Sequence, residues 1–241
     1  MNDLKKMDEE QSVLRWGGLA GILGGITFIL VFIIVIVFVG PEPAEPEGEV
    51  MRFPDIRAAR TLENSLYLLV LILWVAHFLA LYRALRETSL APALFGSVVG
   101  IVGLGMLAAG ALPHVATAPI SDLYHAPRAT PQEQATLVLL WQATQGIFDA
   151  LFIAGLAILP IGLIVLGVAM LGAPAFGKGF GWMSLVVGVL GVTAGVVLLI
   201  DPGSPIAIVS VLSLIVFHIA LGWKVYSLSR VPSLSRVRRR S

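Results

Sequence analysis

Two histidines lie inside apolar segments of this chain, where imidazole nitrogens have few partners. His77 comes six residues before Arg83. His218 comes six residues before Lys224. If both segments are helices that cross a membrane in the same direction, each histidine lies about 9 Å from the same boundary. Equal depth would suit two axial ligands of a haem b or a shared proton-relay site. It would equally suit two histidines that hydrogen-bond across packed helices.

A second set of polar residues follows helical spacing. Gln142, Gln145 and Asp149 stand at i, i+3 and i+7, which places them on one helix face, and an acid inside a membrane needs water or a partner. The segment 63–86 carries a comparable stripe, made of Glu63, Tyr67, Val70, Trp74, His77 and Leu81. We predict an outward-facing polar cavity lined by Glu63, Tyr67, Trp74, Gln142, Gln145 and Asp149. The alternative is a hydrogen-bond network that fixes the packing of the helices.

Other motifs predict no chemistry. The segment 172–179 matches a phosphate-binding loop except that Gly179 stands where Ser or Thr must hold magnesium, and no strand precedes it. His114, Asp122 and His125 share one connection without a cysteine, which is typical of a wet interface rather than a metal site. No zinc-protease, nucleophile-elbow or dinucleotide-binding motif occurs. We therefore predict no catalytic residue, no metal and a protein that is not an enzyme.

The composition requires a bilayer. Of 241 residues, 57% are hydrophobic and 13% are charged, and the mean hydropathy is +0.91. Soluble domains are about one quarter charged. The apolar runs are continuous, which excludes an alternating membrane barrel. The chain has no cysteine, so disulfides and thiol catalysis are excluded.

Six apolar segments of spanning length predict an all-α, polytopic integral membrane bundle of six helices. The first is 17–39. The second is a helix that Asp55 caps and that includes 63–86. The other four are 93–112, 131–170, 182–200 and 206–226. Glycines at Gly17, Gly21 and Gly25 predict a close approach of another helix. A capping box from Thr130 to Glu133 starts the fourth helix, and Pro160 offers a kink point inside it. We expect 40–49 and 113–130 to be loops.

The distribution of charge predicts the topology. Six spans place both termini on one side, and twelve of the 16 lysines and arginines fall on that side. The positive-inside rule then puts both termini in the cytoplasm of a cell whose plasma membrane holds the protein. The predicted divisions are a tail at 1–14, the transmembrane domain at 15–226 and a basic tail at 227–241. That tail predicts attraction to anionic lipid headgroups and no binding of nucleic acid.

The order of the segments resembles a group of small prokaryotic membrane proteins with six helices, known only as a domain of unknown function. The resemblance rests on RWGGLAGILGGITFIL near the start, HFLALYRALR in the second helix, and ILPIGLIVLGVAML followed by GKGFGWMSLVVGVLG. It covers about 15–226 and implies the architecture, without an activity or a site. From the residues, the favoured role is a non-enzymatic bundle that binds a hydrophobic or cationic small molecule, or a membrane partner, which is another membrane protein or a second copy of the chain. A haem b electron-transfer or redox-sensing protein and a small transporter remain alternatives.

Overall fold

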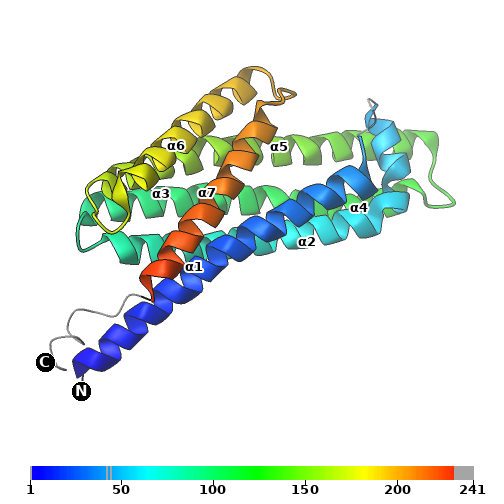
Figure 1. Ribbon diagram of the computed structural model, residues 1–241. Coiled ribbons are helices and arrows are strands. Elements are labelled where there is room, and N and C mark those ends of the chain that lie inside the picture. Colours follow the sequence, from blue (N-terminus) through cyan, green and yellow to red (C-terminus); the bar gives the residue numbers. More distant parts are fainter. Residues whose placement is uncertain (1, 42, 44, 231–241) are drawn as a thin grey trace, which may run out of the picture.

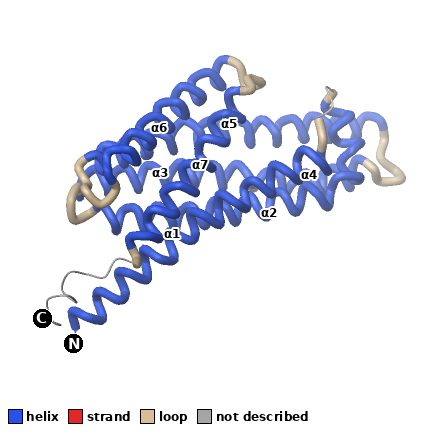
Figure 2. Tube along the Cα trace, viewed as in Figure 1, coloured by secondary structure: helices blue, strands red, loops and turns tan. Residues whose placement is uncertain are grey.

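A computed structural model describes residues 2–41, 43 and 45–230, with side chains from residue 8 onward. This part of the chain is helical throughout, with short connections and no strand (Figure 2). The elements are α1 (Asn2–Ile34), the π-helical turn η1 (Val35–Val39), α2 (Pro46–Leu85), α3 (Leu90–Ala111), α4 (Pro113–Tyr124), α5 (Pro131–Leu171), α6 (Gly177–Ile200) and α7 (Ile206–Leu228).

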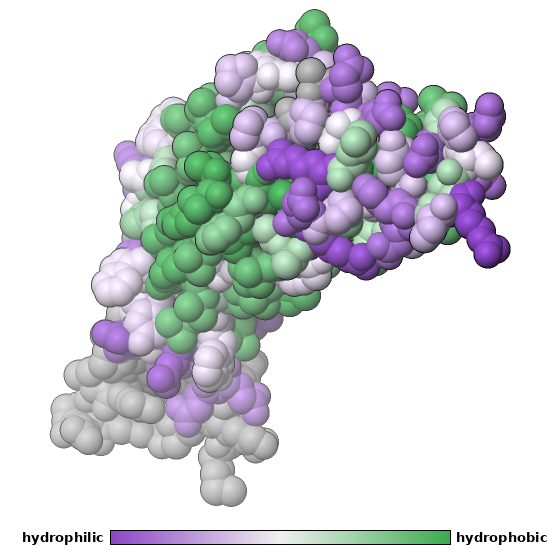
Figure 3. All heavy atoms as spheres, turned by 90° about the vertical axis from the view of Figure 1, so that its right-hand side faces the viewer, coloured by the Kyte–Doolittle hydropathy of each residue, from purple (hydrophilic) through white to green (hydrophobic). Residues whose placement is uncertain are grey.

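Six of these helical stretches are long and apolar enough to cross a membrane, as predicted. They are Asp8–Val39, Pro46–Leu85, Leu90–Tyr124, Pro131–Leu171, Gly177–Ile200 and Ile206–Leu228. Apolar residues form a broad band on the face seen in Figure 3, while hydrophilic residues gather at the end that carries α4. The described fold is therefore the predicted all-α arrangement of six apolar helices.

The long helices close into a ring. In order around it they are α1, α2, α3, α5, α6 and α7, and α7 returns to α1. The start of α1 and the end of α7 lie at one end of the molecule, whereas α4 lies at the opposite end (Figure 1). We call the end with α4 the outer end. A hydrophobic core fills the ring, with Trp74, Phe78 and Phe217 among its fully buried side chains.

Glycines on α1 bring its backbone against two neighbours. A Cβ at Gly18 would lie 2.8 Å from the carbonyl oxygen of Gly222 on α7, and one at Gly21 would lie 2.6 Å from His77 Nδ1 on α2. A Cβ at Gly24 would lie 2.7 Å from the indole nitrogen of Trp74. A larger residue at any of these positions requires a neighbouring side chain or helix to shift. The predicted close approach at the α1 glycines is confirmed.

Glycines also allow α5 to pack closely against α3 and α6, its two neighbours in the ring. Gly162 packs against Gly96 and Gly100 of α3, and the ring of Pro160 fills the space at Gly191 of α6. The helix is continuous through Pro160, from the capping box at Thr130 to Leu171. The predicted start of this helix is confirmed.

The predicted tail at 1–14 continues α1 from Asn2 onward, and Glu10 pairs with Arg83 and Arg86 of α2. Three expectations about the polar segments are wrong. The helix α2 begins at Pro46, inside the expected loop 40–49. Asp55 lies within α2 and does not cap it. The expected loop 113–130 contains α4, with Pro113 in its first turn. Proline suits the first turn of a helix, where its missing N–H leaves no bond unmade, so these prolines start helices and do not mark loops. The predicted basic tail lies outside the described residues after Arg230.

The outer end has a small core of its own. Val50 and Phe53 of α2 pack with Ile120 and Tyr124 of α4 and with Trp141 of α5. The rings of Phe53 and Trp141 meet edge to face, with centroids 5.3 Å apart. This second core holds the first part of α2 against α4 and α5.

The contact between α3 and α5 gives a first test. In Gly162→Ala the new Cβ would lie 2.5 Å from the backbone nitrogen of Gly100, so the two helices must separate. We expect a loss of about 1–3 kcal/mol, as for an overpacked core, and a melting temperature lowered by several degrees in detergent. Gly146→Ala is the control on the same helix, because a Cβ there meets nothing within 4 Å. Equal melting temperatures for the two variants would contradict this account of the packing.

Candidate functional site

A cavity of about 300 Å³ opens between α2, α4 and α5 at the outer end. We call it the outer cavity. Its walls are mainly apolar, and its polar groups come chiefly from α2. It is lined by Pro43, Glu49, Arg52, Phe53, Ile56, Arg57, Arg60, Thr61, Asn64, Ser65, Leu68, His114, Val115, Thr117, Ala118, Trp141 and Gln145.

Three arginines of α2 face the outer cavity, and they differ in their partners. Arg57 forms an ion pair of 2.7 Å with Asp122 of α4, in which both side chains are about half exposed. Arg60 pairs with Glu63 one turn along α2, at 3.1 Å, and both are mostly buried. Arg52 donates to the carbonyl oxygen of Pro41 at 2.6 Å, and none of the described residues brings it a carboxylate. Among the described residues, Arg52 therefore contributes a positive charge that is paired with no carboxylate.

The acids of this region hold the outer core together. The indole N–H of Trp141 donates to Glu49 at 2.8 Å, and the hydroxyl of Tyr124 donates to Glu47 at 2.9 Å. Both acids stand in the first turn of α2, where the helix dipole also favours negative charge. These two contacts tie the start of α2 to α4 and α5.

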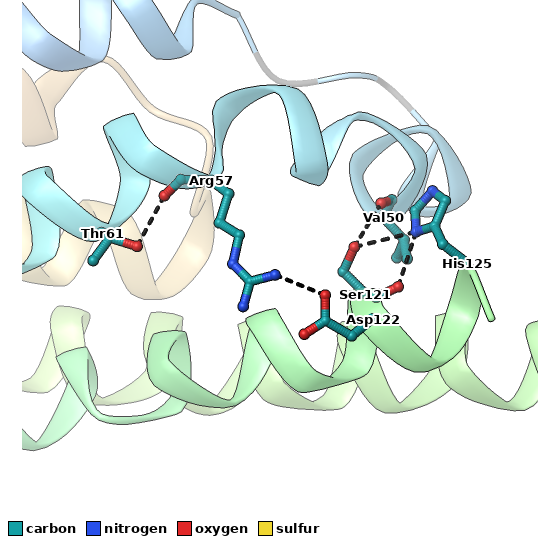
Figure 4. A network of polar contacts seen from close by, with 6 residues as sticks. All are labelled: Val50, Arg57, Thr61, Ser121, Asp122 and His125. Atoms are coloured by element: carbon teal, nitrogen blue, oxygen red, sulfur yellow. Dashed lines mark hydrogen bonds and ion pairs between the residues drawn. The ribbon is translucent and has the colours of Figure 1, made fainter.

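Polar contacts between α2 and α4 complete the rim (Figure 4). The hydroxyl of Ser121 is 3.4 Å from the carbonyl oxygen of Val50, while His125 Nδ1 lies 2.8 Å from the carbonyl oxygen of Ser121. Figure 4 shows Arg57 reaching from α2 to Asp122 on α4. The rim is thus cross-linked between two helices.

A second cavity, of about 160 Å³, adjoins the outer one, because Asn64 and His114 line both. We call it the inner cavity. It is bounded by α1, η1, α2, α4, α5 and α7, and its surface is mostly apolar. It is lined by Phe28, Val31, Phe32, Val35, Glu63, Asn64, Tyr67, His114, Phe148, Phe152 and Val211. His114 stacks on Phe148 with ring centroids 4.2 Å apart, at the junction of the two cavities.

Each cavity contains one buried polar atom without a hydrogen bond. In the outer cavity it is Gln145 Oε1, and in the inner cavity it is the hydroxyl of Tyr67. Neither has a partner among the described residues. Buried polar groups in proteins are nearly always hydrogen-bonded, and a lone one costs about 1–3 kcal/mol. These two atoms are therefore positions where a bound molecule can complete the bonding.

The structure separates the residues predicted to line one cavity. Glu63 and Tyr67 line the inner cavity and Gln145 lines the outer one. Gln142 and Asp149 are exposed on α5 and line neither of these two cavities. The reason is competition for the inward face of α5, which is taken by Trp141, Thr144 and Phe148.

Trp74 lies in the ring core beside the two histidines. His218 stacks on it with centroids 3.9 Å apart and planes 9° apart, and His77 meets His218 edge-on at 5.3 Å. His77 Nδ1 donates to the carbonyl oxygen of Gly17 at 3.0 Å. All three side chains are fully buried. The prediction that the histidines lie at one depth is thus confirmed.

These histidines do not fit a haem in this arrangement. Axial ligation puts the iron and its porphyrin between two imidazoles. Here His77 and His218 contact each other directly, and Trp74 covers one face of His218, with Phe78 and Phe217 at its edges. Neither of the two cavities reaches either histidine. The geometry is that of packed aromatic side chains.

The remaining polar candidates of the sequence are separated. His114 stacks on Phe148, Asp122 pairs with Arg57, and His125 bonds to the backbone of its own helix. The segment 172–179 forms the connection from α5 to α6, and Gly177 begins α6 with φ of 72°. No phosphate-binding strand precedes it.

Sequence reasoning missed Arg52, Arg57, Arg60, Glu49 and Trp141 as site residues. The spacing of the three arginines could have indicated this site, because they fall on one side of a helix if α2 is extended back to Pro46. That extension was hidden by the four prolines between Pro41 and Pro54.

The fold and the site together define the architecture of a multi-pass membrane protein with two adjoining cavities at one end of its helical ring. Comparisons with protein-family models, with curated proteins and with solved structures found no match. The cavities themselves are therefore the features from which a function can be inferred.

The contact between Trp141 and Glu49 gives a second test. Trp141→Phe keeps an aromatic ring beside Phe53 but removes the N–H that Glu49 accepts. Hydrogen bonds to charged groups contribute about 1.5–3 kcal/mol, so we expect a lower melting temperature in detergent. Trp182→Phe is the control, because that side chain is 59% exposed on α6. If both substitutions leave the melting temperature unchanged, the outer core does not depend on this bond.

Proposed function

We propose that this protein binds a small, largely apolar molecule in its two adjoining cavities, from the outer side of a plasma membrane in which both termini are cytoplasmic. The single observation that carries the proposal is the pair of cavities. The outer one, at about 300 Å³, has the size of small-molecule sites, which combine apolar walls with a few placed polar groups. The inner one extends it toward the middle of the ring.

The distribution of polar residues supports this orientation. The outer cavity lies between α2, α4 and α5 at the end of the molecule where hydrophilic residues gather (Figure 3), so a ligand can enter from water. At the opposite end, Lys224 lies 5.9 Å above the ring of Phe180, and Arg230 lies 4.5 Å above that of Tyr226. Basic residues at the ends of spans favour a cytoplasmic position beside anionic headgroups.

The ring core favours a binding protein over a transporter. Beyond the inner cavity the rings of Tyr67, Phe28, Trp74 and His218 follow one another with centroids 3.9–5.8 Å apart. We call this series the aromatic column. It fills the interior between the inner cavity and His77, so passage through the ring would require several buried rings to move. A haem is disfavoured by the same packing.

The absence of cysteine from the sequence makes a direct binding test possible. Ala118 of α4 lines the outer cavity and is partly buried. In Ala118→Cys we expect 4-phenylbutan-1-ol to slow the reaction of the single thiol with N-ethylmaleimide in a saturable way, because the ligand occupies the space that the reagent must enter. The measurement is the labelling rate by mass spectrometry in detergent.

Ala116→Cys is the matched control on the same helix. Ala116 is exposed and does not line either cavity, so the labelling rate of this variant must not respond to the alcohol. Equal protection of the two variants would indicate a general effect on the detergent micelle and would contradict the proposal. So would the absence of protection in Ala118→Cys up to the solubility limit of the alcohol.

A further inference from the structure

We propose that the ligand is an organic anion, with a carboxylate or phosphate head held by Arg52 in the outer cavity and an apolar group of about the size of a benzene ring in the inner cavity. This inference rests on the proposed function and specifies the class of molecule bound. It is carried by three observations: the charges at the rim, the unpartnered polar atoms and the shape of the apolar end.

The charges at the rim favour an anion. Three arginines and one acid line the outer cavity, and a second acid, Asp122, pairs with Arg57 at the rim. The lining acid, Glu49, already accepts the indole N–H of Trp141. Among the described residues, Arg52 donates to the carbonyl oxygen of Pro41 and to no carboxylate. A guanidinium in this position can offer paired N–H donors to a carboxylate or phosphate, an arrangement that is stronger than neutral hydrogen bonds.

Arg57 can also bind the anion with little loss of protein stability. The ion pair between Arg57 and Asp122 has about half of each side chain exposed, and such surface pairs contribute little stability. Arg57 can therefore turn toward a bound anion. Arg60 is held differently, because it and its partner Glu63 are about four-fifths buried. That pair also occupies the acid that a cationic ligand would need in the inner cavity.

The inner cavity suits a compact apolar group. Its volume of about 160 Å³ is close to that of an engineered apolar cavity of about 150 Å³ that binds benzene. Phe28, Phe148 and Phe152 line it, and aromatic rings prefer offset or edge-to-face contacts with one another. Asn64 and His114 line both cavities, so a ligand that reaches from the inner cavity to the arginines passes these two side chains.

The two unpartnered atoms lie at opposite ends of this route. Gln145 lines the outer cavity, where its side-chain amide can donate to an anionic head group once the carboxamide turns over. The hydroxyl of Tyr67 lines the inner cavity, where it can donate to the face of an aromatic ring or to an ether or hydroxyl oxygen on the ligand. A molecule that spans both cavities can bond to both side chains, through the amide N–H₂ of Gln145 and the hydroxyl of Tyr67, whereas a free inorganic anion reaches only Gln145.

Three probes that share one apolar part test the inference. They are 4-phenylbutyrate, 4-phenylbutan-1-ol and 4-phenylbutylamine, which are an anion, a neutral alcohol and a cation at pH 7. Protection of the thiol of the Ala118→Cys variant from N-ethylmaleimide is measured for each, relative to the ligand-free rate of the same variant. We expect the anion to bind most tightly and the cation least. Inorganic phosphate, tested alone, should not protect.

Two further substitutions, each made in the Ala118→Cys background, assign the two ends of the ligand. Arg52→Gln should weaken 4-phenylbutyrate by about tenfold or more and leave the alcohol unchanged, since only a charged hydrogen bond is lost. Val211→Phe should fill part of the inner cavity and weaken all three probes together. Arg128→Gln is the control, an exposed arginine near the outer end that lines neither cavity. The melting temperature of every variant is compared with that of its parent, and the Arg52→Lys variant covers the case in which Arg52→Gln does not fold.

The outcomes distinguish this inference from the proposed function. If all three probes protect the Ala118→Cys thiol equally, or if the amine binds best, the cavities bind ligands but the preference for an anion is wrong. If inorganic phosphate protects as well as 4-phenylbutyrate, the apolar part of the inference is wrong and a free anion is the ligand. If none protects, the proposed function fails with it. A loss specific to the anion in Arg52→Gln, absent in Arg128→Gln, supports the inference.

Discussion

The close contact of helix backbones at glycine is the interaction on which the ring depends. Lipid chains are as apolar as leucine, so burial alone gives helices little reason to associate in a membrane, and contact at short range must provide it. Gly18 with Gly222 brings α7 onto α1, and Gly100 with Gly162 brings α3 onto α5. Glycine also makes room for large groups: Gly21 and Gly24 admit His77 and Trp74 of α2 to the centre of the ring.

The outer end is built differently, and the cavities follow from that difference. No glycine occurs in α4, and α5 has none before Gly146. Here the helices are held apart by larger side chains such as Phe53, Tyr124 and Trp141, and are joined by hydrogen bonds to acids of α2. Helices separated by side chains at one level and by glycine at the next cannot fill the space between them uniformly. The outer and inner cavities lie at this transition.

Much of the ring could be predicted from the sequence, and less of the site. Hydropathy and length identify the six apolar helices, and the capping box at Thr130 gives one helix start, because these signals are local. The helical segments that begin at Pro46 and Pro113 could not be predicted in this way, since they pack against each other and against α5, for example where Tyr124 bonds to Glu47 and Trp141 to Glu49. Periodicity grouped Gln142, Gln145 and Asp149 on one face, but it cannot state which face turns inward. Packing decided that in favour of Trp141 and Phe148.

The sequence predicts where the two histidines lie but not what they do. Their equal depth follows from spacing alone, yet their role depends on what surrounds them, and here that is aromatic. His77 connects three helices, because it donates to Gly17 of α1 and its ring meets His218 of α7. The aromatic column is therefore part of the packing that holds α1, α2 and α7 together. Because these rings are closely packed, a ligand cannot easily displace them, and they close one end of the inner cavity. A site whose walls are already in place loses little conformational freedom on binding, which favours retention of a small ligand over its passage.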